Sequence, residues 1–136
     1  MLKVFIADDS DEVRERLRGL VSEVENVTVV GEASDGVEAL RGIDASRPDA
    51  VILDIRMPHL NGFDVLDELH FLDANPVVIV LTAFAYRQYR DRCLKAGAAH
   101  FFDKATEFER IADVLVGLQG LDGGGSLASP LLSPPC

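Results

Sequence analysis

Residues 51–58 read Val-Ile-Leu-Asp-Ile-Arg-Met-Pro, and this stretch decides the class of fold. Its first three side chains are all bulky and apolar, so a strand formed here is apolar on both faces. Strands of that kind lie inside parallel sheets that helices cover on both sides. The apolar run stops at Asp54, where a strand would meet its loop. We therefore predict a buried parallel strand with a carboxylate at its carboxyl end.

Four more short apolar runs occur along the chain, and segments of helical period separate them. One such segment carries Val13, Leu17 and Leu20, whose spacing places them on one helix face. Five repeats of strand then helix predict a doubly wound α/β sandwich around a parallel sheet. The predicted strands are Lys3–Ala7, Val27–Glu32, Ala50–Asp54, Val77–Thr82 and Ala99–Phe102.

Capping residues and glycines predict the helix boundaries. In chain order the signals are a capping box of Asp35 with Glu38, Gly62 opening the third helix, a fourth helix over Tyr86–Lys95 stopped by Gly97, and a capping box of Thr106 with Glu109. Residues 1–118 are thus predicted to form one domain. Residues 119–136 are rich in glycine, serine and proline, and we predict a mobile tail there.

Composition narrows the class of protein. A length of 136 residues fits a single core, and the net charge of −10 disfavours a surface that binds nucleic acid. The apolar start of the chain is too short for a signal peptide, and no stretch reaches the ~20 apolar residues of a membrane span. The two cysteines match neither a metal-binding nor a disulfide spacing. We expect a cytoplasmic protein without direct contact to nucleic acid or membrane.

Polar residues follow four of the predicted strands at the same end of each. Asp8 and Asp9 follow the first strand, Asp54 ends the third, Thr82 ends the fourth and Lys104 follows the fifth. In a parallel sheet these positions meet in one crevice. Three carboxylates require a compensating cation, and Mg²⁺ binds carboxylates together with water and phosphate oxygens. An aspartate is also an established nucleophile for phosphoryl groups, and a lysine can hold a phosphoryl oxygen.

Each of these residues has an ordinary interpretation when it is taken alone. Asp9 or Ser10 suits the N-cap of the first helix, Lys104 suits an exposed surface, and Thr82 suits any strand. The coincidence of all the polar residues at one edge of the sheet favours a functional site.

The ordered set of motifs resembles the receiver domain of bacterial two-component response regulators. The matching residues are Asp8-Asp9, Asp54 within Asp54-Ile55-Arg56-Met57-Pro58, Gly62, Thr82-Ala83, Ala96-Gly97-Ala98, Phe101 and Lys104. The resemblance extends from Lys3 to about Leu118. It implies a flavodoxin-like fold of five helices and a five-stranded parallel sheet in the order 2-1-3-4-5.

The resemblance also implies a role for each acid. Asp54 is expected to accept a phosphoryl group from a histidine kinase or a phosphotransfer protein. Mg²⁺ is expected to bind Asp9, Asp54 and the backbone carbonyl of Arg56, with Asp8 acting mostly through water. Such a domain promotes its own phosphorylation and dephosphorylation but is not an enzyme acting on small molecules.

The remaining roles concern the phosphoryl group and the output. Lys104 and Thr82 are expected to contact the phosphoryl oxygens, and Thr82 with Phe101 to form the switch. Core packing is the ordinary alternative for Phe101. The output is expected through the fourth helix, fifth strand and fifth helix, where Tyr86–Arg92 forms an aromatic and basic surface or simply a solvated helix face. The domain is then a monomer or a phosphorylation-dependent homodimer, stand-alone or cut from a longer regulator, and its output partner stays open.

Two features depart from the usual family pattern. Ala105 stands where proline commonly follows the lysine, and a cis bond without proline costs about 3 kcal/mol, so we expect a trans Lys104–Ala105 bond. Arg56 and Phe84 flank the site at positions that vary in the family. We expect Phe84 to restrict water and Arg56 to form a charge contact across the pocket, giving slow autodephosphorylation.

Three rival functions remain for comparison. A phosphatase with an aspartyl-phosphate intermediate favours an Asp-x-Asp pair on the first strand, which differs from the adjacent Asp8-Asp9. A nucleotide or flavin module needs a phosphate-binding loop after that strand, where the acids of Asp8–Asp11 repel phosphate. A receiver-like domain that is never phosphorylated does not require the complete set of acids, Thr82 and Lys104.

Overall fold

One parallel sheet organises the chain, and its strand order is β2-β1-β3-β4-β5. The computed structural model describes residues 1–72 and 75–120. The order confirms the flavodoxin-like topology that the family resemblance implied. The strands are β1 (Leu2–Ala7), β2 (Val27–Ala33), β3 (Ala50–Leu53), β4 (Val77–Thr82) and β5 (His100–Asp103).

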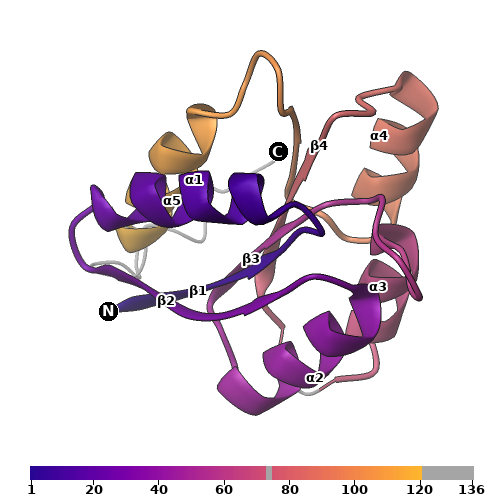
Figure 1. The fold of residues 1–136 in the computed structure, drawn as a ribbon, viewed down its shortest axis with the longest axis horizontal. Helices are drawn as coiled ribbons and strands as arrows, with labels where there is room; N and C mark the ends of the chain where they lie inside the picture. Colours follow the sequence, from indigo (N-terminus) through magenta and orange to yellow (C-terminus); the bar gives the residue numbers. More distant parts are fainter. Residues whose placement is uncertain (73–74, 121–136) are drawn as a thin grey trace.

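Helices cover both faces of the sheet, as Figure 1 shows: α1 and α5 lie on one face and α2, α3 and α4 on the other. Alternate residues of each strand supply the two apolar layers. Val51 and Leu53 pack in the layer under α2, α3 and α4, and Ile52 packs in the layer under α1 and α5. The helices are α1 (Asp11–Ser22), α2 (Gly36–Ser46), α3 (Gly62–Leu69), α4 (Arg87–Lys95) and α5 (Arg110–Gly120).

The central strand β3 confirms the prediction from its sequence. Every side chain from Ala50 to Leu53 is at most 1 % exposed, because helices cover both faces of this strand. Asp54 follows as the first residue outside the strand, and its backbone N–H donates to the carbonyl of Ala7 at 2.9 Å. The sheet ladder thus extends up to the acid and fixes its place beside the end of β1.

The helix boundaries agree with the sequence in most places. Asp35 caps α2 by accepting from the backbone N–H of Glu38, although the Glu38 carboxylate reaches Ser34 rather than Asp35. Gly62 opens α3 as predicted. Gly97, with a φ of 110°, follows the end of α4 and adopts the left-handed region that favours glycine.

The starts of two helices differ from the sequence predictions. A capping box of Asn61 with Asp64 precedes α3, and the sequence interpretation had overlooked it. The predicted capping box of Thr106 with Glu109 is wrong, because α5 begins at Arg110.

The last two features to compare with the sequence predictions are the end of the domain and the loop after β5. Helix α5 continues to Gly120, past the predicted boundary at residue 118, and the rest of the predicted tail lies outside the described residues. No peptide bond is cis in the described ranges, so Lys104–Ala105 is trans as expected. No helix within residues 1–72 and 75–120 has both the length and the apolar character to cross a membrane.

Candidate phosphoacceptor and metal site

The carboxyl edge of the sheet brings together the polar residues that the sequence singled out. Asp8 and Asp9 leave the end of β1, Asp54 leaves β3, and Thr82 is the last residue of β4. Lys104 follows β5, and its backbone N–H donates to the carbonyl of Thr82 at 2.9 Å. The predicted cluster therefore forms at one edge, as the topology requires.

Asp8 is almost fully buried, with 2 % of its surface exposed, and each of its carboxylate oxygens has a partner. The backbone N–H of Ser10 donates to Oδ1 at 2.9 Å. Lys104 Nζ lies 2.8 Å from Oδ2. These contacts hold the Asp8 carboxylate toward the centre of the crevice.

Asp54 lies beside Asp8 and is 5 % exposed. Lys104 Nζ donates to its Oδ2 at 3.2 Å, and the backbone N–H of Arg56 donates to its Oδ1 at 3.5 Å. Burial, followed by the negative charge of Asp8, raises the pKa of Asp54, and the charge of Lys104 opposes that rise only in part. Burial, more than the charge of Asp8, therefore disfavours the ionised form of Asp54.

Lys104 bridges the two buried acids with a single ammonium group. Burial alone lowers the pKa of Lys104, but hydrogen bonding to Asp8 and the charge of Asp54 outweigh it and raise the pKa overall. The lysine therefore stays charged beside the two acids.

Asp9 completes a set of three carboxylates around the crevice. Asp8, Asp9 and Asp54 each offer one oxygen, and these oxygens lie within 4.8 Å of one another. Asp9 is exposed, whereas the other two acids are buried. Excess negative charge and all-oxygen donors with one side open to solvent suit Mg²⁺, which keeps several waters and few protein ligands.

Thr82 and Phe101, the expected switch pair, are both buried. Thr82 is fully buried, and its Oγ1 accepts from the backbone N–H of Phe84 at 3.0 Å. Phe101 is 5 % exposed and packs in the layer beneath α2, α3 and α4. Phe102 packs in the opposite layer, so the two neighbouring rings serve different faces of the sheet.

Arg56 and Phe84 flank the site and contact each other. The guanidinium carbon of Arg56 lies 4.4 Å from the centroid of the Phe84 ring, a cation–π arrangement. The sequence interpretation expected Arg56 to make a charge contact across the pocket. Its charged group lies against an aromatic face instead.

Arg14 also touches the site, and the sequence interpretation missed it. Its Nη1 donates to the backbone carbonyl of Asp8 at 2.6 Å. The available signal was an arginine in the first turn of the helix that follows the acid pair, three residues after Asp11.

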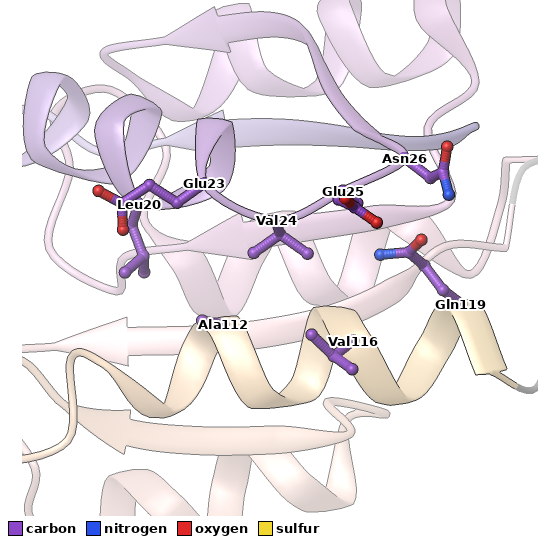
Figure 2. A pocket seen from close by; sticks show the side chains of 8 residues that line it. All are labelled: Leu20, Glu23, Val24, Glu25, Asn26, Ala112, Val116 and Gln119. Atoms are coloured by element: carbon purple, nitrogen blue, oxygen red, sulfur yellow. The ribbon is translucent and has the colours of Figure 1, made fainter.

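A cavity of about 500 Å³ lies elsewhere, between α1 and α5, as Figure 2 shows. Val24, Ala112 and Val116 contribute apolar surface to it, and Glu23 and Gln119 are among its polar lining residues. Asn26 also lines it and precedes β2, with its carbonyl bonded to the N–H of Leu2 at the start of β1. The cavity thus opens near the amino edge of the sheet and takes no part in the acidic site.

Comparison with known proteins agrees with the geometry. A family model described as the response regulator receiver domain matches residues 4–116. The receiver domain of the putative response regulator NarL from Mycobacterium tuberculosis superimposes with a TM-score of 0.79 at 33 % identity, covering 88 % of this chain and 97 % of that one. A CheX–CheY–BeF3–Mg complex from Borrelia burgdorferi superimposes with a TM-score of 0.73 at 30 % identity, covering 85 % and 90 %.

Curated relatives are longer than this chain. The uncharacterized transcriptional regulatory protein YhcZ of Bacillus subtilis is 36 % identical over 135 residues, which are 98 % of this chain and 60 % of that protein. YvfU of the same organism, named in the same way, is 38 % identical over 115 residues, covering 85 % and 58 %. This chain thus spans about 60 % of the length of these relatives.

Proposed function

Because this chain belongs to the response regulator receiver domain family, we propose that Asp54 accepts a phosphoryl group in a Mg²⁺-dependent transfer. The donor is a phosphorylated histidine of a histidine kinase or of a phosphotransfer protein. The observation that carries the proposal is the pairing of a buried Asp54 with Asp8, with one lysine shared between them. Receiver domains are signalling domains rather than enzymes for small molecules, and the proposed role is of that kind.

The nucleophile is a carboxylate oxygen of Asp54. It attacks phosphorus in line with the bond to the donor imidazole, which breaks as the acyl phosphate forms. Burial and Asp8 disfavour the charged form of Asp54, so the carboxylate needs compensation before it can react. Mg²⁺ held by Asp9, Asp54 and the backbone carbonyl of Arg56, with Asp8 mostly through water, would neutralise the acids and the charge that spreads over the phosphoryl oxygens.

Lys104 and Thr82 supply the remaining contacts to the phosphoryl group. The Lys104 ammonium already reaches Asp54 at 3.2 Å, so a phosphoryl oxygen bonded to Asp54 falls within its range. The Thr82 hydroxyl accepts from the N–H of Phe84, which leaves its own proton free to donate. Movement of Thr82 toward the new oxygens opens space for Phe101, and the face formed by α4, β5 and α5 responds.

The exposed part of α4 gives this output face an aromatic and basic character. Tyr86 is 53 % exposed and packs edge-on against Tyr89, with ring centroids 5.3 Å apart. We propose that the face binds an output partner or a second copy after phosphorylation. The names of the longer relatives favour an output in transcriptional control, while the net charge of −10 disfavours direct contact of this chain with nucleic acid. A cytoplasmic location fits this role.

The test is incubation of the purified chain with Mg²⁺ and a small phosphodonor, followed by intact-mass analysis. We expect a gain of one phosphoryl group in the wild type, no gain in Asp54→Ala, and loss of the gain when EDTA removes Mg²⁺. Asp67→Ala removes an exposed aspartate of α3 and serves as the matched control, which should gain the group normally. An equal gain in Asp54→Ala contradicts the proposal, as does catalytic turnover of a small phosphate ester.

A further inference from the structure

Arg14 connects the acid-bearing loop after β1 to strand β2. Its Nη1 donates to the backbone carbonyl of Asp8 at 2.6 Å, and its Nε lies 3.3 Å from Oε1 of Glu32. Only 15 % of the Arg14 side chain is exposed, so both contacts lie in a partly desolvated setting. A planar guanidinium can satisfy two such partners at once, which an ammonium cannot do in the same geometry.

Glu32 gives this connection a fixed end. It lies in β2 and pairs with Ile6 of β1, immediately before the strand end that carries the acids. Arg18 Nη1 holds the same carboxylate at 2.7 Å from Oε1 and 2.8 Å from Oε2. The Glu32 carboxylate is therefore anchored independently of Arg14, and Arg14 extends from that anchor to the loop.

The carbonyl that Arg14 holds belongs to the peptide unit that joins Asp8 to Asp9. The Asp8 carboxylate has its own partners in Ser10 and Lys104. In residues 1–72 and 75–120, no hydrogen bond or ion pair orients the Asp9 carboxylate. The direction of the exposed Asp9 side chain thus depends on the orientation of its backbone.

The third nitrogen of Arg14 pairs with Asp11, but this contact adds little. The Asp11 side chain is 92 % exposed, so solvent screens its charge and the pair contributes little to stability. The contacts to Asp8 and Glu32 are therefore the informative ones.

We propose that Arg14 is a positioning residue that orients the Asp8–Asp9 peptide and thereby sets the affinity of the acid cluster for its divalent cation. This inference rests on the proposed metal site and goes beyond it, because Arg14 itself contacts no cation. The charge of Arg14 and its positioning role lead to opposite predictions for cation affinity when this arginine is removed. Removing a positive charge beside three acids strengthens cation binding, whereas releasing the peptide weakens it.

The experiment uses the full 136-residue chain and Mn²⁺ as the spectroscopic probe, with free Mn²⁺ measured by electron paramagnetic resonance and Mg²⁺ as the competitor. We expect Arg14→Gln to raise the Mn²⁺ dissociation constant about 10-fold, the lower end of the usual effect of residues that orient ligands. Arg14→Lys keeps the charge but loses the planar guanidinium that reaches two partners at once, and it should also weaken Mn²⁺ binding. Arg41→Gln is the matched control, since it removes an exposed arginine of α2 that pairs with neither Asp8 nor Glu32, and its affinity should not fall.

A second measurement separates orientation from global damage. Thermal unfolding in EDTA checks that each variant is folded. The amide NMR signal of Asp9 should shift in Arg14→Lys and stay in place in Arg41→Gln. Wild-type or tighter Mn²⁺ binding by Arg14→Gln overturns the inference and leaves the proposed function intact. Should Arg14→Gln fail to fold, Arg14→Lys decides by the same criterion. Absence of Mn²⁺ binding in the wild type overturns this inference and the proposed metal site together.

Discussion

Gly62 occupies a position where a methyl group would press on the backbone of Asp54, the proposed phosphoacceptor. It is the first residue of α3, and its N–H donates to the carbonyl of Ile55 at 2.7 Å. A Cβ at this residue would lie 2.5 Å from the carbonyl oxygen of Asp54 and 2.7 Å from the Cα of Ile55. Both are backbone atoms, so no side-chain rotation can relieve the overlap.

The structure sets the size of the expected effect for Gly62→Ala. The Asp54 carbonyl oxygen and the new methyl group must separate by about 0.9 Å to reach an ordinary contact of 3.4 Å. Overpacking of this kind lowers the free energy of unfolding by about 1–3 kcal/mol. A displacement near 1 Å at a reacting group can reduce a rate by about 100-fold, so phosphorylation of Asp54 should slow by roughly 10- to 100-fold.

Gly19→Ala is the matched control for this prediction. Gly19 lies within α1, and no neighbouring atom lies within 4 Å of the position that its new methyl group would take. The alanine should therefore raise the free energy of unfolding by about 0.5–1 kcal/mol and leave the phosphorylation rate unchanged. Denaturant titration and the rate of mass gain with a small phosphodonor measure both quantities. Equal or greater stability of Gly62→Ala relative to Gly19→Ala would refute the reasoning, as would an unaltered phosphorylation rate.

Three further predictions concern charge, water access and reactivity. Burial and Asp8 raise the pKa of Asp54 above its ordinary value of 3.8, so the folded state binds this proton more tightly than the unfolded state does. The folded state therefore loses stability as the pH rises from 3.8 through the raised pKa. Asp54→Asn should unfold at a higher temperature than the wild type in EDTA at pH 7, and a lower unfolding temperature would contradict this. Phe84 is expected to restrict water, so the wild-type acyl phosphate should outlast that of Phe84→Ala in a single-turnover decay, and a wild-type lifetime of only seconds would disprove slow autodephosphorylation. Cys93 is fully buried and burial raises the pKa of its thiol to about 11, so peptide mapping after brief alkylation at pH 8 should find it unmodified until denaturant is added.

The sequence predicted the fold well where apolar pattern alone decides the structure. The apolar residues of β3 require burial on both faces of the strand, so the sequence alone predicted a strand inside the sheet. The start of α5 was different. Thr106 and Glu109 matched a capping motif, but Glu107 instead accepts from the backbone N–H of Asp103 at 3.0 Å and helps to hold the chain in a turn. A local motif cannot reveal which of two nearby carboxylates reaches the backbone.

The same distinction separates the parts of the site that the sequence could predict from those that it could not. The sheet edge collects Asp8, Asp54 and Lys104 because strand direction fixes where each strand ends, and the sequence carries that information. The contact of Arg14 with Glu32 depends on the pairing of β1 with β2 and on the side chain's rotamer, which no local pattern encodes.

The identity of the phosphorylated residue tests the central claim most directly. The wild-type chain is phosphorylated with a small phosphodonor and Mg²⁺, the acyl phosphate is reduced with borohydride, and tandem mass spectrometry locates the homoserine that an aspartyl phosphate leaves behind. We expect homoserine at position 54 alone, and none when Mg²⁺ is removed with EDTA. Homoserine at position 8 or 9, or a phosphoryl group stable to reduction on another side chain, would contradict the assignment of Asp54 as the phosphoacceptor.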